Sequence, residues 1–242
     1  MYCGFCVLDS NYIDPCIVTL TTLKRNYNGD FKVFYRSGMD VTRLKFLGFP
    51  LIPISFQKFP CMCWRYNLIS DLLLAKLAIF SELSKHYKGV FNLDLDLHIR
   101  KPLNFDLKEP GWYGCLETPL KGHYINFGFS ILYNKPFDFL ISDFFKFIQD
   151  NQADCPEQDY INFRFKDIIR VLPSFVSWNF NLPFEDDPIM VHHLGDYKPY
   201  TLIPDSLKQN KEFMYYKREY IKTALEIPEL TESFRAVMKT NM

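Results

Sequence analysis

Segments with two different hydrophobic periods alternate along this sequence, and that alternation constrains the fold more than any other feature. Short apolar runs and longer stretches with a helical repeat follow one another from the N-terminus to about residue 200. The first three, residues 3–8, 15–24 and 31–35, read as strand, helix and strand. This order predicts an α/β layer architecture with crossovers between strands.

Two later stretches show the 3.6-residue spacing of apolar positions that one face of a helix requires. Residues 68–87 carry such a stripe, with Lys76 at its centre. Because an unpaired buried ammonium is costly, Lys76 either reaches the edge of the helix or meets an anion. Residues 137–150 carry a second stripe, which we expect to face the core. Its expected core positions are Phe137, Leu140, Ile141, Phe144 and Ile148.

The composition is that of an ordinary globular chain. With 242 residues and 48% hydrophobic content, we expect one domain with one substantial core. The 28 basic and 28 acidic residues cancel, so no overall field favours nucleic acid or an acidic membrane. The opening MYCGFCVLD lacks the pattern of a secretory signal, and no stretch reaches the ~18 apolar residues of a membrane span. We therefore expect a cytoplasmic chain without a transmembrane segment.

The seven cysteines are odd in number and irregular in spacing, which argues against a disulfide framework. Two pairs, Cys3/Cys6 and Cys61/Cys63, look superficially like zinc ligands. A zinc ribbon needs two CxxC pairs, whereas the second pair here is CxC. We therefore expect buried, reduced thiols.

The most informative short segment is GVFNLDLDLHI, residues 89–99. Its odd positions are apolar and its even positions include Asp94 and Asp96, a period of two that predicts one strand with both carboxylates on one face. Like charges on one face of a sheet repel, and aspartate disfavours strands. A hard divalent cation between them removes that conflict, because carboxylate oxygens suit Mg²⁺ and Mn²⁺. The alternative is a half-exposed strand with a solvated acidic face.

A second polar segment, VHHLGDYKPY, crowds two histidines, a glycine and a lysine into residues 191–200. Imidazole is a ligand for Mn²⁺, and lysine can pair with phosphate. Histidine beside a turn is usually structural, so this segment alone decides little.

Five segments, in this order, resemble the family-8 retaining glycosyltransferases, which include glycogenin and bacterial lipopolysaccharide galactosyltransferases. VLDSNYIDPCIVTLTTL is similar to the family's nucleotide-binding first strand, and LLLAKLAIFSELSKHYKGVFNLDLDLHIRKPL to its helix leading into the DxD strand. YINFGFSILYN resembles the NAG or NSG segment, PEQDYINFRF the DQ motif, and VHHLGDYKPY the HxxGxxKPW motif. The resemblance implies a GT-A fold, with a mostly parallel mixed central sheet flanked by helices and followed by C-terminal helices.

Carried over position by position, the resemblance implies a role for each matching residue. The implied metal ligands are Asp94, Asp96 and His192, with His98 and His193 as rivals. The residues implied around the donor diphosphate are Lys76, Gly195 and Lys198. The other implied nucleotide and donor contacts are Leu8, Asp9, Asn11, Tyr12, Leu95 and Glu117. The candidates near the reacting sugar are Asn126, Glu157, Gln158 and Lys76.

The implied reaction moves a sugar from a nucleotide-diphosphate donor, usually UDP-linked in this family, with Mn²⁺ or Mg²⁺ stabilising the leaving group. The family retains the anomeric configuration, but the amide Gln158 is a poor nucleophile, so front-face transfer is equally compatible. Phe127, Glu157 and Tyr200 depart from the family pattern, so the donor sugar is not transferable. The acceptor stays open among a saccharide, a lipid-linked sugar, a protein and a modified nucleobase.

We expect residues 1–204 to form the catalytic core and residues 205–242 a helical extension of the same domain. That extension reads as two amphipathic helices separated at Pro228. Two rival functions remain. One is a non-catalytic sugar-nucleotide-binding protein; the other is a metal-dependent phosphohydrolase or nuclease. The carboxylates that a hydrolase would use are Asp94, Asp96, Glu157, Asp159 and Asp186.

Overall fold

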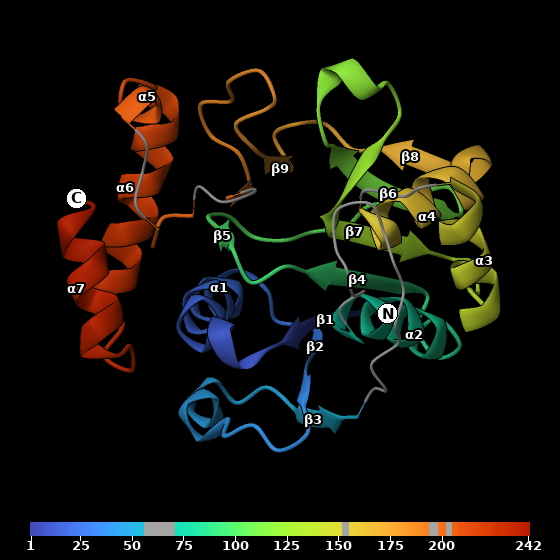
Figure 1. Ribbon diagram of the computed structural model, residues 1–242, viewed down its shortest axis with the longest axis horizontal. Coiled ribbons are helices and arrows are strands. Elements are labelled where there is room, and N and C mark those ends of the chain that lie inside the picture. The colour runs from blue at the N-terminus through green and yellow to red at the C-terminus, as the bar shows by residue number, and fades with distance from the viewer. Residues whose placement is uncertain (56–70, 152–154, 194–197, 202–204) are drawn as a thin grey trace.

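The computed structural model describes residues 1–55, 71–151, 155–193, 198–201 and 205–242 (Figure 1). The strands are β1 (Tyr2–Leu8), β2 (Asp30–Arg36), β3 (Leu51–Ile54), β4 (Gly89–Leu93), β5 (Leu97–Ile99), β6 (Gly111–Leu116), β7 (Ile125–Tyr133), β8 (Ile169–Val171), β9 (Ser177–Trp178) and β10 (Met190–His192). The α-helices are α1 (Ile13–Asn26), α2 (Asp71–Leu83), α3 (Ile141–Asn151), α4 (Pro156–Arg164), α5 (Asp205–Lys208), α6 (Lys211–Leu225) and α7 (Glu232–Thr240). Short 3-10 helices are η1 (Ser10–Tyr12), η2 (Thr42–Leu47), η3 (Pro119–Lys121) and η4 (Lys166–Ile168).

The described strands form two sheets. The larger has the order β3-β2-β1-β4-β7-β6-β8, and the smaller has the order β5-β10-β9. In the larger sheet β1, β2, β3 and β4 run parallel, β7 is antiparallel to β4 and β6, and β8 is parallel to β6. The expected strand–helix–strand opening and the mixed, mostly parallel α/β sheet are therefore confirmed.

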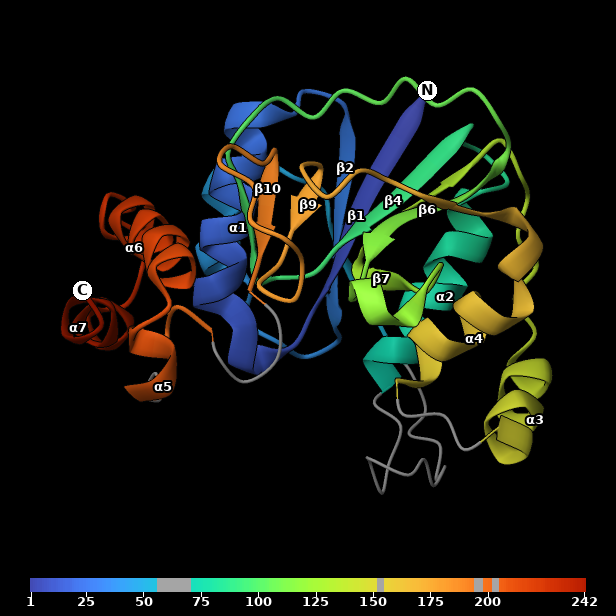
Figure 2. The same cartoon turned by 90° about the horizontal axis from the view of Figure 1, so that it is seen from above.

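Helices cover both faces of the larger sheet, with α1 on one face and α2 and α4 on the other (Figure 2). Along β1, Cys6 and Leu8 belong to the hydrophobic cluster that contains α1, whereas Phe5 and Val7 belong to the cluster that contains α2. Strands buried on both faces are continuously apolar, which explains the unbroken apolar run at the start of the sequence.

The cysteines of β1 are free thiols buried in opposite layers. Cys3 lies in the cluster on the α2 side and Cys6 in the cluster on the α1 side, so the two cannot ligate one ion. Cys61 and Cys63 lie outside the described residues.

Two helix predictions need correction. Helix α2 ends at Leu83, because the chain turns at residues 84–86 to enter β4; residues 68–70 of the predicted helix lie outside the described part. Helix α3 begins at Ile141, which is 39% exposed, and the preceding Leu140 is 63% exposed. Residues 137–140 precede the helix, so the helical spacing does not apply to them. The predicted core positions Phe137, Phe144 and Ile148 are nevertheless buried, and α3 also buries Phe147.

The C-terminal helices pack against α1. Tyr220 and Ile221 of α6 and Met238 of α7 share its hydrophobic cluster. The Asp14 carboxylate of α1 accepts hydrogen bonds from Thr231 N at 3.1 Å and Thr231 Oγ1 at 3.0 Å. The predicted separation of two helices around Pro228 is confirmed. None of the described helices has the length and apolarity that crossing a bilayer would require.

Candidate active site

The two aspartates lie in a turn between the sheets. Strand β4 of the larger sheet ends before Asp94, and β5 of the smaller sheet begins after Asp96, so the prediction of one strand through both is wrong. Asp94 N donates to Gly128 O at 2.7 Å, and Asp96 O accepts from His193 N at 3.1 Å. The period of two persists across the break because Leu95 and its apolar neighbours stay buried. The turn thereby holds one carboxylate to each sheet.

Strand β10 brings His192 to this turn. The ligand atoms of Asp94, Asp96 and His192 all lie within 4.8 Å of one another. His192 Nε2 is 3.1 Å from Asp96 Oδ1 and 4.0 Å from Asp94 Oδ2. Asp96 Oδ1 is buried, and apart from the facing His192 nitrogen it has no hydrogen-bond donor. Two carboxylates and an imidazole suit a divalent cation such as Mn²⁺, and a buried carboxylate oxygen without a further donor fits such an ion.

The rival ligands His98 and His193 do not join this cluster. His98 Nε2 is 3.3 Å from Thr223 Oγ1 of α6, and the His193 ring packs against Tyr220 of the same helix, with 5.2 Å between ring centroids. Burial lowers the pKa of His98 to about 4, so its imidazole is neutral at physiological pH. These two histidines therefore serve the packing of α6 on the smaller sheet.

Two lysines pair with the aspartates. Lys76 Nζ of α2 lies 2.5 Å from Asp94 Oδ1, and Lys198 Nζ pairs with Asp96 Oδ2 and donates to His193 O at 2.6 Å. Burial lowers the pKa of Lys76, but the nearby Asp94 and Glu157 charges outweigh burial and hold that pKa above its ordinary value. Of the two alternatives for Lys76, the structure shows the second, because its ammonium meets an anion, the Asp94 carboxylate.

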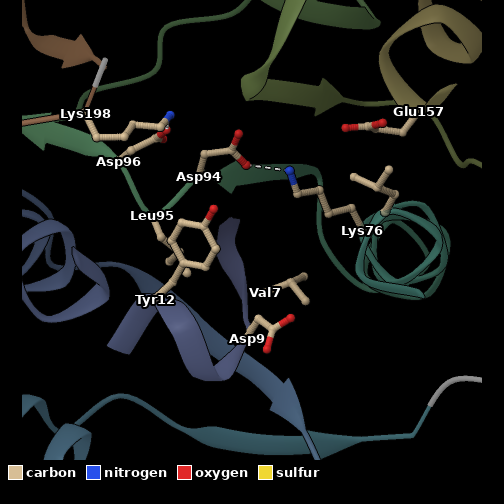
Figure 3. A pocket seen from close by; sticks show the side chains of 10 residues that line it. Val7, Asp9, Tyr12, Lys76, Asp94, Leu95, Asp96, Glu157 and Lys198 are labelled. Carbon is tan, nitrogen blue, oxygen red and sulfur yellow. Dashed lines mark hydrogen bonds and ion pairs between the residues drawn. The ribbon is translucent and has the colours of Figure 1, made fainter. Parts of the chain in front are cut away.

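A cavity of about 450 Å³ opens beside these ion pairs (Figure 3). Lys76, Asp94 and Glu157 face one another across one part of it, and Tyr12 and Asp9 approach from the end of β1. The side chains that line the cavity are Val7, Asp9, Tyr12, Leu73, Lys76, Asp94, Leu95, Asp96, Glu157 and Lys198. Eight of the predicted site residues thus share one cavity.

Other predicted nucleotide contacts lie elsewhere. The Leu8 side chain is fully buried in the α1 layer, and Asn11 is exposed on η1; neither lines the cavity. Val7 and Leu73 line it instead, and the sequence showed only that both are apolar. The predicted Gly195 lies outside the described residues.

The candidates near the reacting sugar divide into two groups. Glu157 lines the cavity, where burial raises the pKa of its carboxyl and Lys76 opposes that rise. Asn126 donates from Nδ2 to Glu117 and accepts at Oδ1 from Gly128 N at 2.8 Å. Gln158 is buried, and its Oε1 accepts from the backbone N–H that follows Asn126 at 2.8 Å. Asn126, Glu117 and Gln158 therefore support the strand beside the cavity and do not line it.

Two residues of the buried strands were not predicted to serve the site. A Cβ added at Gly128 would lie 2.0 Å from Cε1 of His192, so only glycine leaves room for that ring. Asn92 donates to Phe127 O at 2.8 Å and accepts from Ser130 Oγ at 2.7 Å, which fixes β7 against β4. Their signal in the sequence is a glycine and an amide inside otherwise apolar strands.

Asp94, Asp96 and Glu157 share the cavity, but the other two carboxylates of the hydrolase alternative do not join them. Asp159 accepts from the Tyr124 hydroxyl and from Cys155 N at 2.9 Å, and Asp186 is exposed. Within the described ranges the metal-binding geometry comprises Asp94, Asp96 and His192 alone. A two-metal carboxylate centre therefore has no basis in this part of the chain.

No model of a known protein family and no curated protein sequence matches this sequence. Solved structures do match in three dimensions. The chain is similar to the galactosyltransferase LgtC, solved with donor and acceptor sugar analogs, with a TM-score of 0.72 and 14% identity over 98% of this chain and 100% of that one. The chain has a GT-A glycosyltransferase fold.

Two further structures share the GT-A fold at similarly low sequence identity. The glycosyltransferase GlyE of Streptococcus pneumoniae TIGR4 matches with a TM-score of 0.67 and 15% identity over 98% of this chain and 62% of that one. Mouse xyloside xylosyltransferase 1 matches with a TM-score of 0.55 and 12% identity over 84% of this chain and 99% of that one. The resemblance to family-8 glycosyltransferases is therefore confirmed at the level of the fold.

Proposed function

We propose that this chain is a glycosyltransferase that binds a nucleotide-diphosphate sugar, UDP-linked, together with a divalent cation, and transfers the sugar to an acceptor with retention of configuration. The observation that carries the proposal is the cluster of Asp94, Asp96 and His192 beside a cavity that two lysines also line. The cavity lies at the carboxyl end of β1, where open α/β sheets bind their ligands.

Asp94, Asp96 and His192 would hold Mn²⁺ or Mg²⁺, which when bound supplies a Lewis acid for the leaving nucleoside diphosphate. Lys76 and Lys198 place two ammonium groups beside the same carboxylates, where they stabilise phosphate charge. We assign both lysines to the diphosphate of the donor.

The part of the cavity near the end of β1, which Asp9 and Tyr12 line, suits the nucleoside. Tyr12 lines the cavity and is 42% exposed, so an aromatic ring is accessible there for stacking on a base. Asp9 lines the same end and offers carboxylate oxygens to base or ribose donors, and Arg36 holds that carboxylate at 3.7 Å. We assign Asp9 and Tyr12 to nucleoside recognition.

The sugar would lie toward Glu157, which meets the cavity from α4 (Figure 3). The Gln158 amide is engaged by the backbone of β7, and an amide is a weak nucleophile. Retention through front-face attack by the acceptor therefore suits these residues better than a covalent intermediate on Gln158. We propose that the acceptor is a saccharide, a lipid-linked sugar or a protein hydroxyl.

We also propose that residues 1–242 act as one glycosyltransferase unit. Asn241 Nδ2, at the C-terminal end, donates to Pro199 O and Thr201 O at 3.1 Å each. Both acceptors lie within three residues of Lys198. The helical extension therefore supports the loop whose lysine we assign to the donor diphosphate.

A thermal-shift and donor-turnover screen tests the function. UDP-sugars and other nucleotide sugars are each added with Mn²⁺, Mg²⁺ or chelator, since ligand binding to the native state raises the Tm. We expect cation-dependent stabilisation by one sugar nucleotide, with slow release of its nucleoside diphosphate. A chain that binds none of these donors with either cation is not a glycosyltransferase of this kind.

A further inference from the structure

Each of the two carboxylates of the candidate metal site lies between one lysine and His192. Asp94 Oδ1 is 2.5 Å from Lys76 Nζ, and Asp94 Oδ2 is 4.0 Å from His192 Nε2. Asp96 gives Oδ2 to Lys198, and its Oδ1 faces the same nitrogen at 3.1 Å. A cation held by the oxygens facing His192 would therefore lie close to two ammonium groups.

The charges of this group balance without a cation. Two carboxylates and two ammonium groups have a formal sum of zero, and most of these side chains are at least five-sixths buried: Lys76 is 13% exposed, Lys198 16% and Asp96 11%. With Glu157 counted as a further anion beside Lys76, a divalent cation alone would leave one net positive charge where solvent screens poorly. The two negative charges of a nucleotide-sugar diphosphate would offset that excess.

We propose that Lys76 and Lys198 exclude the free cation, so that the site takes the cation and the diphosphate together as one chelate. On binding, both ammonium groups would exchange carboxylate oxygens for phosphate oxygens. This inference rests on the proposed function, because it assigns a diphosphate to the site.

The surroundings of each lysine support this exchange. Lys198 Nζ also donates to His193 O at 2.6 Å, so a second bond holds the ammonium in place when Asp96 is released. Lys76 lies near Glu157, whose charge also acts on it, so its ammonium keeps an anionic neighbour when Asp94 turns to the cation. Both lysines line the cavity that would hold the phosphates.

When either lysine is replaced, free-cation binding and chelate binding should respond in opposite directions. Replacing either lysine with methionine removes one competing positive charge and keeps the side-chain length. We expect free Mn²⁺ to bind Lys76→Met and Lys198→Met about tenfold more tightly, which corresponds to about 1.4 kcal/mol of removed competition. We expect UDP at saturating Mn²⁺ to bind the same variants about tenfold or more weakly, because each has lost a phosphate contact.

The experiment uses the full chain. Free Mn²⁺ is counted by its electron paramagnetic resonance signal during titration, and UDP binding is measured by calorimetry with Mn²⁺ and with chelator. Lys85→Met is the matched control, because Lys85 pairs with Glu82 at 2.8 Å in an exposed turn after α2. Thermal unfolding of every variant checks the fold, and Lys198→Gln replaces Lys198→Met if the latter does not fold.

Tighter Mn²⁺ binding with weaker UDP binding in both lysine variants, and no change in Lys85→Met, supports the inference. Mn²⁺ affinity that stays the same or falls in the lysine variants overturns it, even if UDP binding remains Mn²⁺-dependent. Wild-type protein that binds UDP equally with Mn²⁺ and with chelator contradicts the proposed function instead. The Mn²⁺ titrations do not depend on UDP, so the two failures are distinguishable.

Discussion

The narrow contact between Gly128 and His192 leads to a quantitative prediction for the Gly128→Ala variant. The added Cβ would lie 2.0 Å from Cε1 and 2.7 Å from Nε2 of His192. Carbon atoms reach favourable contact at roughly 3.5 Å, so the imidazole has to retreat by about 1.5 Å. Metal–ligand distances tolerate only ~0.2 Å. The variant should therefore lose the histidine as an effective ligand.

Loss of alignment at one ligand typically reduces metal affinity by about 10- to 100-fold. We expect that reduction in the Mn²⁺ affinity of Gly128→Ala, measured by titration in the presence of UDP. Overpacking also destabilises folded proteins by about 1–3 kcal/mol, so thermal unfolding has to accompany the titration. The titration is made below the onset of unfolding.

A double-mutant cycle separates a local effect on His192 from a general one. If Gly128 acts through His192, the Gly128→Ala change should have little effect on Mn²⁺ affinity in a His192→Ala background. Wild-type affinity in Gly128→Ala would refute the reasoning. So would an equal further loss in the double variant, because the two positions would then act independently.

Three further predictions concern single side chains. Asp96→Asn should abolish the cation dependence of donor binding and turnover while the Tm shows a folded chain; undiminished Mn²⁺-dependent turnover would contradict the ligand assignment. Lys198→Ala should weaken UDP-sugar binding in calorimetry, and unchanged affinity would remove its diphosphate role. The third variant concerns Lys217 of α6, which is fully buried. Burial, together with repulsion from Lys208, lowers the pKa of its ammonium to about 8. At pH 7 folding therefore desolvates a charge, and Lys217→Met should raise the Tm. That gain should shrink between pH 8 and about 10.5, because the folded wild type loses its proton before the unfolded chain does; a pH-independent gain would contradict the desolvation argument.

The sequence predicted the features whose residue pattern is imposed by burial. The apolar run of β1, the helical pattern of α1 and the apolar positions of β2 were sufficient for the α/β layer architecture, because each element places apolar residues in the core. The pair Asp94 and Asp96 stood out because two carboxylates interrupt a buried run. Lys76 stood out because it interrupts an apolar stripe.

The remaining features depend on contacts between distant segments. A period of two does not reveal where β4 leaves one sheet and β5 enters another, since Leu95 stays buried on both sides of the break. The start of α3 was predicted too early, at residue 137, because the apolar spacing continues into the segment before the first helical residue, Ile141. Nothing local shows that Gly128 faces His192, 64 positions further along the chain, because only the packing of β7 beside β10 creates that contact.

The turn that carries Asp94 and Asp96 connects two separate sheets. The geometry of the candidate cation site therefore depends on the packing of residues far from it. Asp94 is tied to the larger sheet through Gly128, and Asp96 to the smaller sheet through His193. Helix α6 packs on the smaller sheet, where the rings of Tyr216 and Trp178 lie 4.9 Å apart. The distance between the two carboxylates therefore depends on how the two sheets are placed. We expect substitutions on the inner face of α6 that shift the smaller sheet to change that distance, while Asp94, Asp96 and His192 stay the same.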